Sequence, residues 1–151
     1  MSMLGCRDPD GCARWARAYT EQMATLLPRA QRLHEEFLKR LPLGTSGWSI
    51  SLHTAERQSL RAIGDAELEA VIECGEPCQV SFEHWGGRML ICGETDQGRP
   101  LHVILEFSWP PKDAQLWEWE VITCYDPRTE PWRWSPDFKQ QVCRCPGHVD
   151  Y

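Results

Sequence analysis

The stretch QVSFEHWGGRMLICG, residues 79–93, decides the fold, because it reads as two strands joined by a tight turn. Apolar residues lie on both sides of Gly86-Gly87, and two adjacent glycines are typical of the short turn of a β-hairpin. Two further apolar stretches, residues 101–109 and 116–125, have the length and composition of strands. The second half of the chain therefore predicts a meander of four strands.

The residues that precede this meander predict one more strand and two helices. Residues 48–52 alternate as a short strand, and residues 53–63 follow as a helix. Gly64 and Asp65 break that helix, and a second helix is expected at residues 65–73. The resulting order, β-α-α-β-β-β-β, predicts an α+β fold with a mainly antiparallel sheet and helices on one of its faces.

Residues 9–41 form a long amphipathic pattern in front of this domain. Apolar residues recur there at three- and four-residue steps, which indicates a helix, and Pro28 is expected to kink or divide it. We therefore divide the chain into an N-terminal helical arm (1–46), an α+β domain (47–132) and an irregular cysteine-containing tail (133–151). The pattern does not decide whether the arm packs on the domain or binds a partner.

The composition limits the classes of partner. The formal net charge is −6 and the sequence pI is about 5.3, whereas general nucleic-acid binders are normally basic. One local cationic cleft, or RNA already held by a larger assembly such as the ribosome, remains compatible with this charge. No window approaches 18 consecutive apolar residues and the N-terminus lacks the apolar stretch of a signal peptide, so a cytoplasmic protein without a membrane partner is expected.

Eight cysteines in a reducing compartment point to burial or metal binding rather than to disulfides. Two lie near the start of the chain, at Cys6 and Cys12, and two lie near its end, at Cys143 and Cys145. Four of these ligands, with His148 as a substitute for one, could form a tetrahedral structural zinc site that ties the termini together. Their spacing matches no standard zinc finger, so free thiols are the alternative.

A second group of residues has the chemistry of metal-free RNA cleavage. That reaction needs a base for the 2′-hydroxyl, a cation for the phosphorane and an acid for the leaving oxygen. His53, Arg57 and Arg61 recur at four-residue steps on one side of the first predicted helix. His102 alternates with apolar neighbours and is expected to point away from the core, and Tyr125 ends the last strand. Two histidines and a few arginines are also expected by chance in a chain of this length.

The same residues belong to a wider pattern. The segment from His53-Thr-Ala-Glu-Arg57 through a second helix that ends in Gly75-Glu76 resembles the opening of the bacterial family called domain of unknown function 4258. The later segments, around His102-Val-Ile and Tyr125-Asp-Pro127, resemble its closing half, and a following Trp132 also fits. The resemblance covers about residues 49–132. A threonine follows His53 where the family commonly has alanine, and Pro110-Pro111 lengthens a hairpin.

This family is related to the RelE/ParE toxins, which are small RNA-cleaving or target-blocking proteins paired with an antitoxin. The resemblance implies a RelE-like toxin-type endoribonuclease that needs no cofactor for catalysis. His53, Arg57, Arg61, His102 and Tyr125 would line its cleft, with RNA or ribosome-bound RNA as substrate and a protein antitoxin as partner. The alternative is a non-catalytic module that binds a protein through the helical arm and the tryptophan-rich tail, as the acidic charge suggests.

Overall fold

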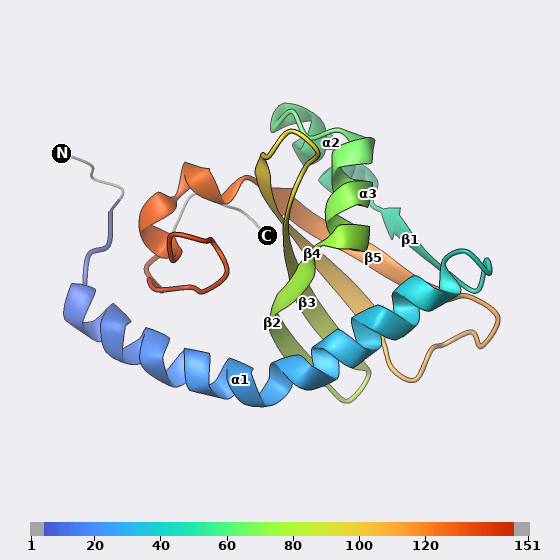
Figure 1. The fold of residues 1–151 in the computed structure, drawn as a ribbon, viewed down its shortest axis with the longest axis horizontal. Helices are drawn as coiled ribbons and strands as arrows, with labels where there is room; N and C mark the ends of the chain where they lie inside the picture. Colours follow the sequence, from blue (N-terminus) through green and yellow to red (C-terminus); the bar gives the residue numbers. More distant parts are fainter. Residues whose placement is uncertain (1–4, 147–151) are drawn as a thin grey trace.

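Five strands form one sheet in the order β1-β5-β4-β3-β2 in the computed structural model, which describes residues 5–146 (Figure 1). The strands are β1 (Ser46–Ile50), β2 (Glu76–Glu83), β3 (Gly86–Glu94), β4 (Pro100–Ser108) and β5 (Trp117–Tyr125). The pairs β2–β3, β3–β4 and β4–β5 are antiparallel, as the predicted meander requires. The predicted α+β class, N-terminal helix and element order are therefore confirmed.

The sheet is mixed rather than purely antiparallel, because β1 pairs in parallel with β5. The register runs from Ser46 opposite Trp117 to Ile50 opposite Val121. Two helices, α2 (Leu52–Leu60) and α3 (Asp65–Cys74), carry the chain from β1 at one edge of the sheet to β2 at the other. In the meander β2-β3-β4-β5 alone, β5 would be an edge strand, and β1 covers that edge.

The helical arm is one continuous helix, α1 (Pro9–Arg40), which contains Pro28 and bends along its length (Figure 1). Asp8 caps it by accepting a hydrogen bond from the backbone N–H of Gly11 at 3.1 Å. A Cβ atom at residue 11 would overlap the Asp8 carboxylate, which would then have to move away from this cap. Although α1 is 32 residues long, no helix within residues 5–146 has both the length and the apolar character needed to cross a membrane.

The main core lies between one face of the sheet, here called the first face, and the helices α1 and α3. Phe37 of α1 stacks on Trp119 of β5 with ring centroids 4.3 Å apart, and Trp117 packs edge-on to both rings. Both tryptophans are fully buried. The helical arm therefore packs on the domain, and these two members of the tryptophan-rich region belong to the core.

The opposite, second face is covered only in part, by the residues that follow β5. From here on, the tail means residues 126–146, which take in the described part of the predicted tail 133–151 and contain two short 3-10 helices, η1 (Pro127–Thr129) and η2 (Pro131–Arg133). A smaller apolar cluster lies between the tail and the sheet, formed by Cys78, Leu90, Cys92, Tyr125 and Trp134. In Figure 1 the tail lies near the beginning of α1, away from α2 and β1.

Candidate metal centre and the predicted catalytic residues

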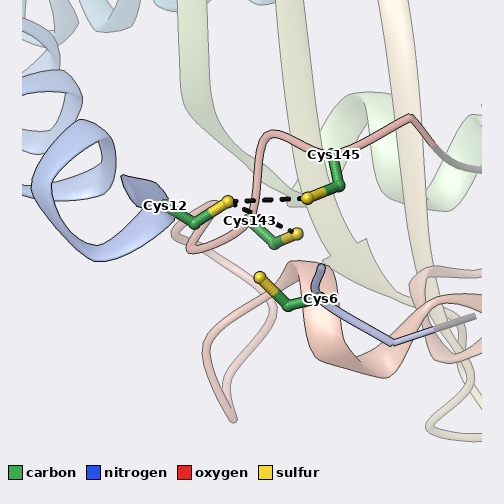
Figure 2. Close-up of side chains that lie close together, drawn as sticks. All are labelled: Cys6, Cys12, Cys143 and Cys145. Carbon is green, nitrogen blue, oxygen red and sulfur yellow. Dashed lines mark hydrogen bonds between the residues drawn. The ribbon is translucent and has the colours of Figure 1, made fainter. Parts of the chain in front are cut away.

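Four cysteine thiols from the two ends of the described chain meet at one point (Figure 2). Cys6, Cys12, Cys143 and Cys145 place their sulfur atoms within 4.8 Å of one another. The predicted proximity of these four residues is therefore confirmed. His148, the predicted substitute ligand, lies outside the described residues.

Two of the sulfur separations match those of a tetrahedral metal cage, and the whole set lies within 4.8 Å. The Sγ atom of Cys12 lies 3.7 Å from that of Cys145 and 3.9 Å from that of Cys143. Four sulfurs bound tetrahedrally at a Zn–S distance of about 2.3 Å would be separated by about 3.8 Å. A disulfide needs a far shorter sulfur separation, of about 2.05 Å. The group therefore has the dimensions of a tetrathiolate site.

The start of α1 places two of these thiols. The Asp8 cap and Pro9 fix where the helix begins, so Cys12 falls in its first turn. Cys12 is only 2% exposed, and its Sγ atom also accepts a hydrogen bond from the backbone N–H of Arg144 at 3.4 Å. Cys6 approaches from the segment that precedes the cap. A thiolate that accepts backbone N–H groups is a common arrangement around metals.

A buried ion pair holds the tail segment that carries the other two thiols. Arg133 donates to the carbonyl oxygens of Cys143 and Cys145 at 3.3 and 2.5 Å. Its Nε atom lies 2.7 Å from a carboxylate oxygen of Glu130, whose side chain is 2% exposed. The guanidinium thus fixes the backbone on both sides of Arg144, which sets the direction of the two cysteine side chains.

Local electrostatics affect the two tail thiols in opposite directions. A hydrogen bond from the backbone N–H of Arg7 lowers the pKa of Cys145 to about 7. Burial raises the pKa of Cys143 to about 12. Near neutral pH, Cys145 is therefore the more readily ionised of the two, and a bound cation would be needed to deprotonate Cys143.

The predicted catalytic residues of α2 lie on the surface. His53 is exposed, and its Nε2 atom accepts a hydrogen bond from Nε of Arg57 at 3.0 Å. Arg61, one turn later, donates instead to the sheet, with its Nη1 atom 2.6 Å from the carbonyl oxygen of Cys124 and 3.3 Å from Oγ1 of Thr123. The sequence thus places His53 and Arg57 together, while the Arg61 guanidinium is anchored to β5.

His102 and Tyr125 are direct neighbours on β4 and β5, and the tail covers them. His102 points away from the main core, as expected, yet it is only 1% exposed. The ring of Trp134 packs edge-on at 4.4 Å, and the Phe138 carbonyl oxygen lies 2.7 Å from Nε2 of the histidine. The expectation of an accessible histidine overlooked this second covering layer, because an irregular tail has no periodicity from which to place it.

These contacts define the protonation state of His102. A carbonyl oxygen can only accept a hydrogen bond, so Nε2 carries the proton and Nδ1 accepts from the Tyr125 hydroxyl at 3.2 Å. Burial lowers the pKa of His102 to about 4. A hollow of 540 Å³ lies beside this histidine, but its lining includes none of His53, Arg57 and Arg61. The five predicted residues therefore form two groups, one exposed and one covered.

Several residues that shape these sites were not selected from the sequence. Arg133, Glu130 and Phe138 lie in the segment predicted to be irregular, and their roles depend on contacts with residues distant in the chain. Pro127 and Pro131, which begin the two 3-10 helices, are the only local signal of ordered structure there. His34 is also buried, with Nε2 2.8 Å from the Ile72 carbonyl oxygen, and burial lowers its pKa.

Comparison with protein-family models, with curated proteins and with solved structures finds no match to this chain. The likeness to domain of unknown function 4258 therefore rests on the quoted residues alone. The conclusions that follow depend on the geometry of the chain itself.

Proposed function

We propose that this chain is a zinc-binding protein in which Cys6, Cys12, Cys143 and Cys145 hold one structural Zn²⁺. The observation that carries the proposal is the meeting of four thiols from opposite ends of the chain at tetrathiolate separations. Four neutral thiols gain little from such an arrangement, whereas a tetrahedral set of four sulfurs is typical of zinc or iron–sulfur sites. All four positions are filled by protein ligands, as in structural rather than catalytic zinc sites.

The role of the metal would be to fasten the tail across the second face of the sheet. Cys12 belongs to α1, whereas Cys143 and Cys145 end the segment that carries Trp134 and Phe138 over His102. The tail's apolar cluster is small, so burial alone contributes much less there than in the main core. Binding energy from the metal would hold the tail in place, because ligands brought together only in the folded chain couple metal binding to folding.

Metal analysis of the purified protein under reducing conditions tests this proposal. We expect about one zinc per chain, by the four-ligand rule for structural sites. Cys143→Ser should abolish retention of the metal, whereas Cys74→Ser, at an exposed cysteine outside the group, should leave it unchanged. Protein that contains no metal and titrates with eight free thiols would contradict the proposal. Iron with visible charge-transfer absorption would instead identify an iron–sulfur site.

A second candidate function is the RelE-like endoribonuclease activity. The observation that favours it is the exposed pair on α2, in which the unprotonated Nε2 of His53 faces the guanidinium of Arg57 at 3.0 Å. An accessible imidazole beside a fixed cation offers a base and a phosphate-binding group in one place. His102 and Tyr125 would join them only if the tail moved away, since Trp134 and Phe138 cover both.

Incubating purified protein with RNA, alone and on ribosomes, tests this second function. Cleavage by the wild type that is lost in His53→Ala and in Arg57→Ala would support it. His84→Ala, at an exposed histidine on the β2–β3 turn, is the matched control and should cleave as the wild type does. Intact RNA in every reaction, with ribosomes present and absent, would remove the ribonuclease hypothesis while leaving the metal proposal untouched.

A further inference from the structure

The half of the second face that the tail leaves open is an acidic surface. It is formed by side chains that point away from the main core. They come from the start of β3, the end of β4, the first half of β5 and β1. We call it the open half; its central residues are Ser49, Arg88, Ile104, Glu106, Glu118, Glu120 and Ile122. Helices reach only its margins: Thr54 of α2 donates to the Ile122 carbonyl oxygen at 3.2 Å, and Tyr19 of α1 lies beside Ile104 and Ile122. The two segments that the sequence suggested for partner binding, α1 and the tail, both pack within the chain.

Two neighbouring hollows mark the open half. One has a volume of 310 Å³ and contains the apolar side chains of Leu90, Ile104 and Ile122, with Tyr19 of α1 at its border. The other has a volume of 370 Å³ and is lined by Glu106, Glu118 and Glu120, with Trp85 and Lys112 among the residues around it. The ion pair between Arg88 and Glu106, 3.0 Å long, lies between the two hollows because each residue lines one of them. The surface thus offers an apolar site next to an anionic one.

The open half places like charges side by side on neighbouring strands, an arrangement that sheets usually avoid. Glu106 and Glu120 are direct cross-strand partners, and Glu118 lies two residues along the same strand on the same side. Like charges directly opposite each other destabilise a strand pair. Arg88 pairs with Glu106, but within residues 5–146 neither Glu118 nor Glu120 forms a salt bridge. Lys112 lines the same hollow but forms a salt bridge with neither of them, so a cationic group from outside the chain would add charge neutralisation that the chain does not supply.

The charge excludes the other kinds of occupant. A nucleic acid or an anionic membrane would meet three carboxylates and would be repelled. A second copy of this chain, with a net charge of −6, would bring the same acidic surface into a two-fold contact. The chain's own residues outside the described range, 1–4 and 147–151, contain no lysine or arginine.

We propose that the open half of the second face binds a basic protein segment that places an apolar side chain against Ile104 and Ile122 and lysine or arginine side chains against Glu118 and Glu120. This proposal does not depend on the bound metal or on ribonuclease activity, because none of those four residues belongs to the cysteine site or to the predicted catalytic groups. Apolar anchoring combined with charge pairing at the border is the usual division of roles in protein interfaces.

Selection from a random peptide library on the immobilised, purified protein tests the proposal. We expect the selected peptides to be enriched in lysine and arginine next to a branched or aromatic apolar residue. The affinity of the best peptide is then measured by fluorescence anisotropy for the wild type and for the double variant Glu118→Gln, Glu120→Gln. Loss of two partly exposed charge pairs should weaken binding by about tenfold.

The matched control is the double variant Glu21→Gln, Glu36→Gln, which changes the net charge equally at exposed positions of α1. It should bind the peptide as the wild type does, and both double variants should retain the wild-type circular dichroism and melting temperature. A library that yields no binders, or binders without excess positive charge, would overturn the proposal. So would equal weakening by both double variants, which would indicate attraction to the overall charge rather than to this face.

Discussion

The two faces of the sheet are covered in different ways, and the difference separates the contacts that hold the domain together from those that hold the tail. On the first face, α1 and α3 bury a continuous apolar cluster that includes Phe37, Trp117 and Trp119. On the second face, the tail makes a small apolar cluster and depends on hydrogen bonds, one buried ion pair and the cysteine site. Apolar burial is spread over many residues, whereas the tail depends on a few specific contacts. We therefore expect damage to the first face to unfold the domain and damage to the tail to remain local.

The largest effect is expected from a change on the first face. Phe37→Ala would remove a fully buried ring that stacks on Trp119, and such substitutions typically cost about 3–5 kcal/mol. Urea denaturation followed by tryptophan fluorescence measures the loss. Leu43→Ala, at a residue that is 74% exposed, is the control and should change the free energy of unfolding very little. A loss below about 1 kcal/mol for Phe37→Ala would contradict this view of the two faces, because apolar burial on the first face would then not be the main source of the domain's stability.

Removal of the proposed metal should affect the tail on the second face and leave the core on the first face intact. A chelator under reducing conditions is expected to increase amide hydrogen exchange in residues 126–146 and at the start of α1, while the amides of β3 and β4 stay protected. Hydrogen exchange with mass spectrometry gives this pattern by segment. Loss of protection throughout the sheet would mean that the metal supports the whole domain rather than the tail.

A smaller effect is expected from the ion pair behind the cysteine site. Arg133→Gln would leave the Glu130 carboxylate without this partner and would remove the donor to the carbonyl oxygens of Cys143 and Cys145. Loss of a buried hydrogen bond to a charged group costs about 1.5–3 kcal/mol, which here should appear as weaker metal retention in competition with a chromophoric chelator. Arg128→Gln removes an ion pair with Asp126 at an exposed arginine and should have little effect. Equal effects of the two substitutions would contradict a specific role for Arg133.

The smallest effect is a pH dependence that comes from the tail-covered histidine. The pKa of His102 is about 4 in the folded chain, below its ordinary value of 6.5, because burial disfavours the charged ring. The unfolded chain therefore binds a proton that the folded chain does not as the pH falls from about 6.5 to 4, and stability is lost across that window. Between pH 7 and pH 5 this one group should lower the free energy of unfolding by about 2 kcal/mol.

Urea denaturation at the two pH values measures this dependence. His102→Phe should remove much of it, whereas His84→Gln, at an exposed histidine, should leave it unchanged. Part of the dependence should remain in the His102 variant, because burial also lowers the pKa of His34. An unchanged dependence in His102→Phe would show that the tail does not bury this ring in solution.

Local sequence signals predicted the elements but not all of their partners. The predicted hairpin of β2 and β3 forms, since consecutive antiparallel strands pair with their neighbours in sequence, but its turn lies at His84-Trp85 rather than at the predicted Gly86-Gly87, which begin β3 opposite Glu83 and Phe82. The parallel pairing of β1 with β5 joins strands some 70 residues apart, as in the pair Ser46 and Trp117, and no local pattern encodes that choice. RelE-like identity remains a prediction, because the order of elements alone does not specify a family.

For the candidate sites too, local sequence patterns did not predict contacts between residues that are distant in the chain. The four cysteines could be grouped from the sequence because thiols are common zinc ligands and these four form two pairs, one early and one late in the chain. The covering of His102 could not be predicted, because it depends on where the carbonyl oxygen of Phe138 and the ring of Trp134 come to lie. Both belong to a segment without regular secondary structure, and Phe138 adopts the uncommon positive φ of 62°. Its position follows from tertiary contacts rather than from propensity.

The meeting of Cys6 with Cys145 has a mechanical consequence. With a metal bound to all four thiols, the chain between them becomes a closed ring, and a force applied at its two ends acts first on the metal–sulfur bonds. The strands would then bear no load until those bonds break. Pulling a single molecule by its termini should therefore give two events with the metal present, a rupture with little gain in length and then unfolding of the sheet. The first event should disappear when the metal is removed.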